Sequence, residues 1–382
     1  MTSKSTIEEP QDNLRDIFST QIVTNYLIYD LIFSAASPGS ILRFSRTCHA
    51  AHLATRDYFA RTFKINKHLS RFFDDPLAFR SLQAKTSTLI SGSSALQFFD
   101  RTHYEESDLD LYVSAKHHRE VGRWMLAQGY KFTPNSIQDP DFEISAGEDN
   151  MNVDVFGYVL QDDRMKGVAA VFTFHKQSPT IPGKRLQVQV IVANTCPMEV
   201  ILWFHSTVVI NVISWDRAYS LYPRATFEHR KSVLLRQRHH NFDDVIQKYT
   251  NRGFGFVFTL DHDDLKSDPA FASSPRWIGD GHSWVIDLPT EGVTLPQPLS
   301  PLSKSLTRDP CYLSTWRLAR AARPTEHVVM DLTVVFSDEL LYYNYVLWDD
   351  KDEQIQRVLR DAAFEWFDKG GRPENPSASS IG

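Results

Sequence analysis

Cysteine is scarce in this sequence, and the cysteines show no ligand pattern. The chain has three, Cys48, Cys196 and Cys311, among 382 residues. They form no CxxC pair and have no matching histidine pair, so their spacing indicates neither a disulfide framework nor a structural zinc site. We therefore expect a reducing, intracellular setting, in the cytoplasm or the nucleus.

The sequence also lacks an uninterrupted apolar run of membrane-spanning length. Its most apolar long stretch, Met198 to Trp215, is interrupted by polar residues such as Glu199 and His205, and a transmembrane helix rarely carries such polarity. Residues 1–11 are polar and include two glutamates, unlike the basic and then apolar start of a signal peptide. We expect the stretch to be core, with no membrane partner and no secretion.

An excess of positive charge is absent as well. The formal net charge is -6, and the sequence pI is about 6.2. This balance argues against a protein that mainly coats nucleic acid, although a local basic patch would still allow a nucleic acid partner. The hydrophobic content of 42% over 382 residues is enough for a large core, and we expect about two or three domains.

The residues that indicate a functional site are concentrated between residues 88 and 113. A turn with Gly92 leads into a short helical segment, and Asp108 and Asp110 follow with one leucine between them. Side chains on a strand alternate with period two, so both carboxylates are expected on one face and the leucines on the other. Two like charges on one face repel unless a cation lies between them, which predicts a Mg²⁺ site.

The turn before these acids has the properties of a phosphate-binding site. Gly92 allows the backbone to approach a ligand closely, and the hydroxyl of Ser93 can donate a hydrogen bond. The first backbone N–H groups of the following helix have no partner within the helix and suit an anion. The alternative interpretation is that Asp108 and Asp110 are ordinary strand or turn acids.

Together, Gly92-Ser93, a helical spacer and Asp108-Leu109-Asp110-Leu111 resemble the pattern of the nucleotidyltransferase superfamily. The resemblance covers about Leu82 to Tyr249. It implies that Asp108 and Asp110 are catalytic metal ligands for Mg²⁺ and that Gly92 and Ser93 bind a nucleoside triphosphate. It also implies transfer of a nucleotidyl group to a hydroxyl acceptor.

The resemblance implies a third carboxylate on a later strand, and here the sequence departs from the pattern. The best-placed run, Leu186 to Ile191, has Gln189 where an acid is expected. A glutamine oxygen can bind Mg²⁺, but it adds no negative charge and cannot accept a proton as a general base. The site is therefore either active or catalytically degenerate and limited to binding. Asp154, between two valines, is another candidate for the missing carboxylate, and a surface acid is the plain alternative.

The amino-terminal part predicts helices. Apolar residues recur near the helical period between Asn13 and Phe79, with a turn at Ser37-Pro38-Gly39. The stretch Ile41 to Cys48 resembles the middle of an F-box, a three-helix module that docks on a Skp-type adaptor in cullin ubiquitin ligases. The Leu-Pro opening of that module is replaced by Leu14-Arg15-Asp16-Ile17. The whole chain resembles a group of fungal proteins with an F-box-like segment ahead of this domain, a likeness that gives an architecture and no activity.

Two interpretations of this amino-terminal part stay open. The resemblance implies an alternative function, in which a non-catalytic adaptor recruits a client protein to a cullin ubiquitin ligase. The plain interpretation is a helical cap that packs on the next domain. Both are compatible with nucleotide binding elsewhere in the chain.

We expect an α+β protein. The expected parts are a helical segment at 1–80, a nucleotidyltransferase-like mixed sheet flanked by helices at 81–250, a smaller α+β region at 251–369 and a flexible tail at 370–382. Within the second part, the patterns predict a helix at 116–128, strands at 153–160, 168–174 and 186–193, the last two as a hairpin, and a helix at 228–250. Arg230 and Lys231 on that last helix are candidate phosphate contacts, and a solvated helix face is the alternative.

Overall fold

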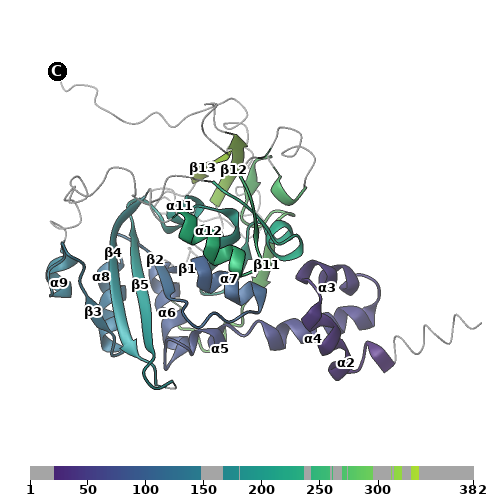
Figure 1. The fold of residues 1–382 in the computed structure, drawn as a ribbon. Coiled ribbons are helices and arrows are strands. Elements are labelled where there is room, and N and C mark those ends of the chain that lie inside the picture. The colour runs from purple at the N-terminus through teal and green to yellow at the C-terminus, as the bar shows by residue number, and fades with distance from the viewer. Residues whose placement is uncertain are drawn as a thin grey trace, which may run out of the picture.

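The computed structural model describes residues 21–147, 167–179, 181–235, 242–258, 260, 269–272, 274–295, 311, 314–320 and 328–334. These residues form helices and a mixed eight-stranded sheet, which confirms the α+β class. In Figure 1 the helices α2 to α4 lie to one side of the part that contains the sheet. The expected tail and the strand at 153–160 lie outside the described residues.

A helical module comes first, with α2 (Tyr26–Ala35), α3 (Pro38–Ser45) and α4 (His49–Thr62). Asn25 begins α2 by accepting a hydrogen bond from the backbone N–H of Leu27, and Ser37 begins α3 in the same way, with Pro38 at the first helical position. The expected turn at 37–39 is therefore the start of a helix. The module has its own cluster of buried side chains, which consists of Val23, Tyr29, Phe33, Ile41, Ala51, Ala54 and Tyr58.

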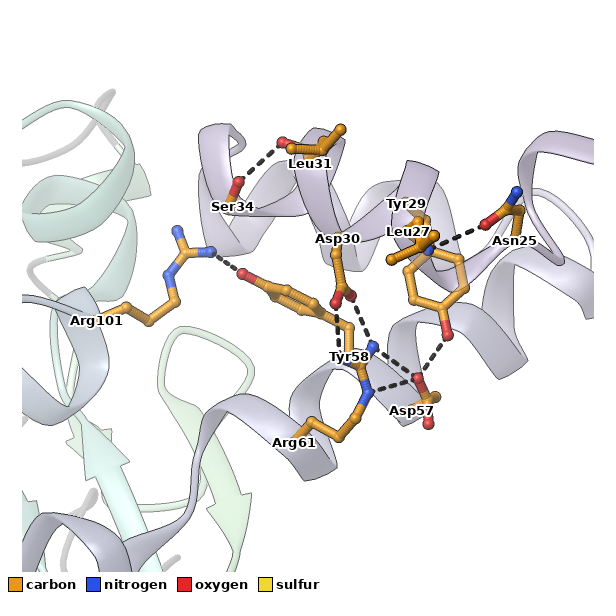
Figure 2. A network of polar contacts seen from close by, with 10 residues as sticks. All are labelled: Asn25, Leu27, Tyr29, Asp30, Leu31, Ser34, Asp57, Tyr58, Arg61 and Arg101. Atoms are coloured by element: carbon orange, nitrogen blue, oxygen red, sulfur yellow. Dashed lines mark hydrogen bonds and ion pairs between the residues drawn. The ribbon is translucent and has the colours of Figure 1, made fainter.

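Polar contacts fasten the helices of this module to one another and to the rest of the chain. The guanidinium of Arg61 binds both carboxylate oxygens of Asp30 at 2.6 Å and also contacts Asp57 (Figure 2). Arg101, which follows the helix that begins at Gly92, donates hydrogen bonds to the hydroxyl of Tyr58 and to the carbonyls of residues 33 and 36. One arginine side chain thus reaches three acceptors of the module.

The other elements follow in chain order. Before the sheet come α5 (Ile65–Leu69) and α6 (Pro76–Thr86). Next come β1 (Leu89–Ser91), α7 (Gly92–Asp100), β2 (Leu109–Ser114), α8 (His118–Ala127), β3 (Lys131–Thr133), α9 (Phe142–Ser145), β4 (Val168–Gln177) and β5 (Arg185–Ala193). They are followed by α11 (Pro197–Leu202), η3 (Thr207–Val209), β6 (Asn211–Ile213), β7 (Arg217–Ser220), η4 (Arg224–Glu228), β8 (Lys231–Val233), α12 (Phe242–Asn251), β9 (Gly255–Val257), η5 (Pro269–Phe271), β10 (Arg276–Trp277), β11 (Trp284–Asp287), β12 (Ser314–Arg320) and β13 (Val328–Val334).

The main sheet has the strand order β11-β7-β6-β1-β2-β5-β4-β3. Its strand pairs are antiparallel except for β2 with β5, which run parallel. The pairing of β4 with β5 confirms the hairpin that the sequence predicts. The helix expected at 116–128 is also confirmed as α8. Because β1 and β5 lie on either side of β2, residues from both neighbours meet the side chains of β2.

The apolar side chains of β2 point into the core, as the alternation predicts. Leu109, Leu111 and Val113 are fully buried, and so are Val188 and Val190 on β5. The apolar stretch at 198–215 folds into α11, η3 and β6, and most of its side chains join the same core. Within the described residues, no helix has both the length and the apolar character that crossing a bilayer requires.

The prediction of a helix at 228–250 is wrong for its first part and is confirmed from Phe242 onward. The structure instead has the π-helical turn η4, the strand β8 and a helix α12 that begins only at Phe242. Residues 233–235 are apolar and buried, and β8 pairs in parallel with β9, so burial in a small sheet prevails over the helical pattern. Arg230 has a positive φ of 51° just before β8 and breaks any helix there.

Candidate functional site

The two aspartates lie beside the Gly-Ser turn, at the junction of β1, α7, β2 and β5. Asp108 comes directly before β2, and Asp110 lies within it, paired with Ser91 on β1 and with Gln189 on β5. Gly92 has a φ of +69°, and a Cβ atom at this position would lie 2.8 Å from Oδ2 of Asp110. The structure thus brings Gly92, Asp110 and Gln189 together.

Asp108 is held by a chain of hydrogen bonds that crosses the sheet. The amide nitrogen of Gln187 donates to Oδ2 of Asp108 at 2.7 Å. The amide oxygen of Gln187 lies 2.7 Å from Nε2 of His175, and Nδ1 of His175 lies 2.9 Å from the hydroxyl of Thr133. An amide oxygen only accepts, so Nε2 is the protonated ring nitrogen and the hydroxyl donates to Nδ1. On β5, Gln187 contacts Asp108 and Gln189 is paired with Asp110.

The surroundings of Asp108 and Asp110 disfavour the ionised form of both carboxyl groups. Burial and, to a smaller extent, the charge of Asp108 together raise the pKa of Asp110 to about 7, against an opposing effect of Lys248. Burial also raises the pKa of Asp108, opposed by Lys248, by His175 and by the hydrogen bond from Gln187. No described residue donates a hydrogen bond to the carboxylate of Asp110. A cation between the two acids would stabilise their ionised forms.

Lys248 on α12 is a residue that the sequence reasoning missed. Burial and the charge of Arg252 lower the pKa of its ammonium group, while Asp110 and Asp108 act in the opposite direction. Lys248 is therefore close enough to couple electrostatically with both acids. Its position in a predicted basic helix was the only signal in the sequence, and no motif distinguishes it from the other cations there.

Arg230, the expected phosphate contact, is occupied elsewhere. Its Nη1 atom donates to Oδ1 of Asp100 at 2.5 Å, and its guanidinium lies 3.8 Å from the centre of the Phe254 ring. Lys231 is exposed on β8. Asp154, the candidate for the third carboxylate, lies outside the described residues.

The start of α7 keeps backbone donors available. The hydroxyl of Ser91, at the N-cap position, donates to the carbonyl of Asn211 at 2.6 Å, and no described side chain caps this helix. The hydroxyl of Ser93 lies 2.8 Å from that of Ser107. The hydroxyl of Ser107 also lies 3.4 Å from the carbonyl oxygen of Asp108, which can accept its proton. When Ser107 instead donates to Ser93, the hydroxyl of Ser93 keeps a proton that it can donate to a ligand. These features suit an anionic oxygen at the helix N-terminus.

A cavity of about 110 Å³ extends from Asp108 and Gln187. Its lining adds basic groups to the neighbourhood of the acids, namely Arg71, His103, Lys184 and Arg185. Two glutamates, Glu105 and Glu106, line it as well. The space next to Asp108 is therefore lined by groups of both charges.

The donor set fits a magnesium ion that keeps most of its water or phosphate ligands. Mg²⁺ prefers oxygen ligands and is commonly held by one or two carboxylates together with substrate phosphates. Asp108 and Asp110 supply two carboxylates, and Gln189 supplies an amide oxygen at the adjacent position of β5. The described residues contain no group of three or more His, Cys, Asp or Glu side chains that could hold a metal ion.

Comparisons of the chain with protein-family models, with curated proteins and with solved structures found no match. The geometry of the site is therefore the basis for assigning a function.

Proposed function

We propose that this chain binds a nucleoside triphosphate together with Mg²⁺ at the site formed by Asp108, Asp110 and the turn at Gly92 and Ser93. One observation carries the proposal: the carboxylate of Asp110 lies directly against the backbone of Gly92, at the uncapped start of α7. A cation on the acids and a polyphosphate on the helix N-terminus would then be neighbours. This adjacency is what a metal-bound triphosphate requires.

Each residue has a distinct task in this proposal. Asp108 and Asp110 would hold the ion, which supplies neutralisation of the phosphate charge when it is bound. Gly92 has no Cβ, so the carboxylate of Asp110 can lie against its backbone. Ser93 would donate a hydrogen bond to the phosphate oxygens. Lys248 contributes positive charge on the same side of the sheet.

The reaction that belongs to this arrangement is transfer of a nucleotidyl group to a hydroxyl acceptor. The acceptor oxygen forms a bond to the α-phosphorus, the bond from that phosphorus to the bridging oxygen breaks, and pyrophosphate leaves. The acceptor proton needs a base. Gln189 cannot be that base, and Asp110 would be bound to the ion, so the acceptor proton passes to water. If no transfer occurs, the site is the degenerate, binding-only form.

Incubation with labelled nucleoside triphosphates tests this proposal. Each labelled triphosphate is added with Mg²⁺, and label is sought both in complex with the protein and on protein, RNA or small hydroxyl acceptors. Asp108→Asn should abolish binding and transfer. Asp287→Asn is the matched control because Asp287 is an exposed acid on β11 that pairs with Arg217 of β7. Equal binding by all three proteins would refute the assignment of the site.

A second candidate function is favoured by one feature of the helical module. On α2, Leu27, Leu31 and Ile32 are 61%, 75% and 51% exposed. Beside them lies an apolar groove of about 280 Å³ whose lining includes Val23 and Phe44. Exposed apolar side chains next to an apolar groove are typical of a docking surface. We propose as the alternative that this surface binds a Skp-type adaptor and that the larger part recognises a client protein.

A binding assay with a purified Skp-type adaptor distinguishes this alternative. Leu31→Asp should abolish capture, while Ile137→Asp, which changes an exposed apolar residue remote in sequence from the module, should leave it intact. Asp108→Asn should also leave capture intact. Capture that survives Leu31→Asp, or no capture at all by the intact chain, would rule out this function.

A further inference from the structure

A groove of about 470 Å³ lies where the helical module meets the sheet-bearing part, remote from the residues of the aspartate site. One wall comes from α3 and the residue that follows it. The other comes from η4 and from residues 281–284, which lead into β11. The residues that line the groove are Pro38, Gly39, Leu42, Arg43, Arg46, Pro223, Arg224, Phe227, Glu228, Pro269, Gly281, His282, Ser283 and Trp284.

The groove is rich in arginine. Arg43 and Arg46 come from the α3 side and Arg224 from η4, and Glu228 is the one carboxylate in the lining. Glu228 is already engaged, because Nη1 of Arg43 binds its Oε2 at 2.9 Å. Its carboxylate also packs directly on the backbone of Gly39, where a Cβ atom would overlap it. The ion pair between Arg43 on α3 and Glu228 on η4 thus neutralises the carboxylate in the lining of the groove.

Arg46 and Arg224 remain without a counter-charge. Both side chains are exposed, and within the described part of the chain neither has an ion pair. His282 stands on the same rim. Two guanidinium groups from different parts of the chain therefore face one groove, and no described acid forms an ion pair with either of them. A guanidinium binds phosphate oxygens through paired hydrogen bonds.

Two packed aromatic residues contribute to the lining of the groove. Phe227 and Trp284 are buried, and their rings pack edge to face with centroids 6.0 Å apart. Trp284 also packs against Phe59, Phe63 and Phe99. A concave site of this volume, with aromatic side chains and a few charged groups in its lining, is typical of small-molecule binding.

We propose that this groove binds a small phosphorylated ligand. Arg46 and Arg224 donate hydrogen bonds to its phosphate oxygens. The ligand would bridge the helical module and the sheet-bearing part, adding to the contact that Arg43 and Glu228 already make. Binding should therefore also raise the thermal stability of the whole chain. This inference is independent of the function proposed for the aspartate site.

Calorimetric titration with inorganic pyrophosphate tests the groove, using the full chain without Mg²⁺ and at about 0.15 M salt, where surface charge is screened. Without the metal, two neighbouring carboxylates disfavour pyrophosphate at the aspartate site. We expect saturable binding that weakens at least about tenfold in an Arg46→Gln/Arg224→Gln variant, since each charged hydrogen bond contributes substantially to affinity.

The matched control is Arg119→Gln/Arg123→Gln, which removes the same charge from α8, where both arginines contact Glu143. This variant and Asp108→Asn should bind pyrophosphate as the unchanged chain does. The inference is overturned by absence of binding at millimolar pyrophosphate, by equal weakening in the two double variants, or by loss of binding in Asp108→Asn alone. Thermal unfolding checks that every variant is folded.

Discussion

Asp110 and Gln189 occupy paired positions on the parallel strands β2 and β5, so an amide stands beside the central carboxylate of the site. Side chains at paired positions on neighbouring strands lie within contact distance. Among the described residues, the carboxylates of the site are consequently those of Asp108 and Asp110, and β5 adds an amide. Because Gln189 is an amide, the site has no group at this position of β5 that can accept a proton.

Replacing this amide should strengthen the metal site. We expect Gln189→Glu to increase Mg²⁺ affinity about tenfold, because a third carboxylate adds charge next to Asp110. It should also increase any nucleotidyl transfer, since the new group can act as a base. Calorimetric titration with Mg²⁺ measures the first effect.

The control for this substitution is Gln247→Glu, which adds the same charge on the exposed side of α12, where Gln247 donates to Asn251. That variant should bind Mg²⁺ as the unchanged chain does. An equal effect of the two substitutions would mean that general charge, and not the position beside Asp110, is responsible.

A side chain at Gly92 should damage both stability and binding. Gly92→Ala would place a Cβ atom 2.8 Å from Oδ2 of Asp110 on a backbone with a φ of +69°. We expect a loss of about 2 kcal/mol in the free energy of unfolding and a loss of triphosphate binding. Urea unfolding and equilibrium binding measure the two effects.

Gly183 separates the two causes in this prediction. It has a φ of +77°, and no atom lies within 4 Å of its added Cβ. Gly183→Ala should therefore show only the backbone strain, of about 1 kcal/mol, and retain triphosphate binding. If Gly92→Ala binds as well as Gly183→Ala, the turn does not hold the phosphates.

The hydrogen bonds from His175 to Gln187 and from Gln187 to Asp108 should affect Mg²⁺ affinity, although neither His175 nor Gln187 is a proposed ligand of the ion. Gln187→Leu removes the donor at 2.7 Å from Oδ2 of Asp108. Residues that orient a metal ligand typically change affinity about tenfold or more when they are removed. We expect such a loss of Mg²⁺ affinity for Gln187→Leu, and a smaller loss for His175→Ala, which removes only the next link. The reverse order of the two effects, measured by calorimetry, would show that the chain does not act through Gln187.

Much of this arrangement could be predicted from the sequence because it depends on local rules. The period-two alternation puts Asp108 and Asp110 on one face and the leucines in the core. The positive φ of Gly92 matches the turn expected there. These features need no information about distant parts of the chain.

The parts that could not be predicted depend on contacts distant in sequence. Lys248 is coupled to the aspartates only because α12 packs near β2, some 140 residues away in sequence. Arg230 was expected to meet phosphate, but it is bound by Asp100. Gln187 and His175 act on Asp108 only through the register of β4, β5 and β2. The domain boundaries at residues 80, 250 and 369 stay predictions.

The imidazole of His68 should make stability depend on pH. Burial, with the charges of Arg71 and His103, lowers the pKa of His68 to about 4 from 6.5, and its Nε2 lies 3.0 Å from the hydroxyl of Ser94 on α7. The unfolded chain therefore takes up a proton at a higher pH than the folded chain. Stability is complete above about pH 6.5 and falls as the pH decreases toward about 4.

Urea unfolding at about pH 7.5 and about pH 5 measures this dependence. The contribution of His68 should be a decrease of about 2 kcal/mol in the free energy of unfolding between these values. His68→Gln cannot titrate, so it should show a decrease smaller by that amount. An identical decrease in both proteins would show that other groups control the acid sensitivity.

Equilibrium binding of a labelled nucleoside triphosphate during a Mg²⁺ titration tests the central claim most directly. The account predicts saturable binding that needs the metal and that is lost in both Asp108→Asn and Asp110→Asn while Asp287→Asn keeps it. No binding at millimolar triphosphate, or binding that both aspartate variants retain, would contradict it.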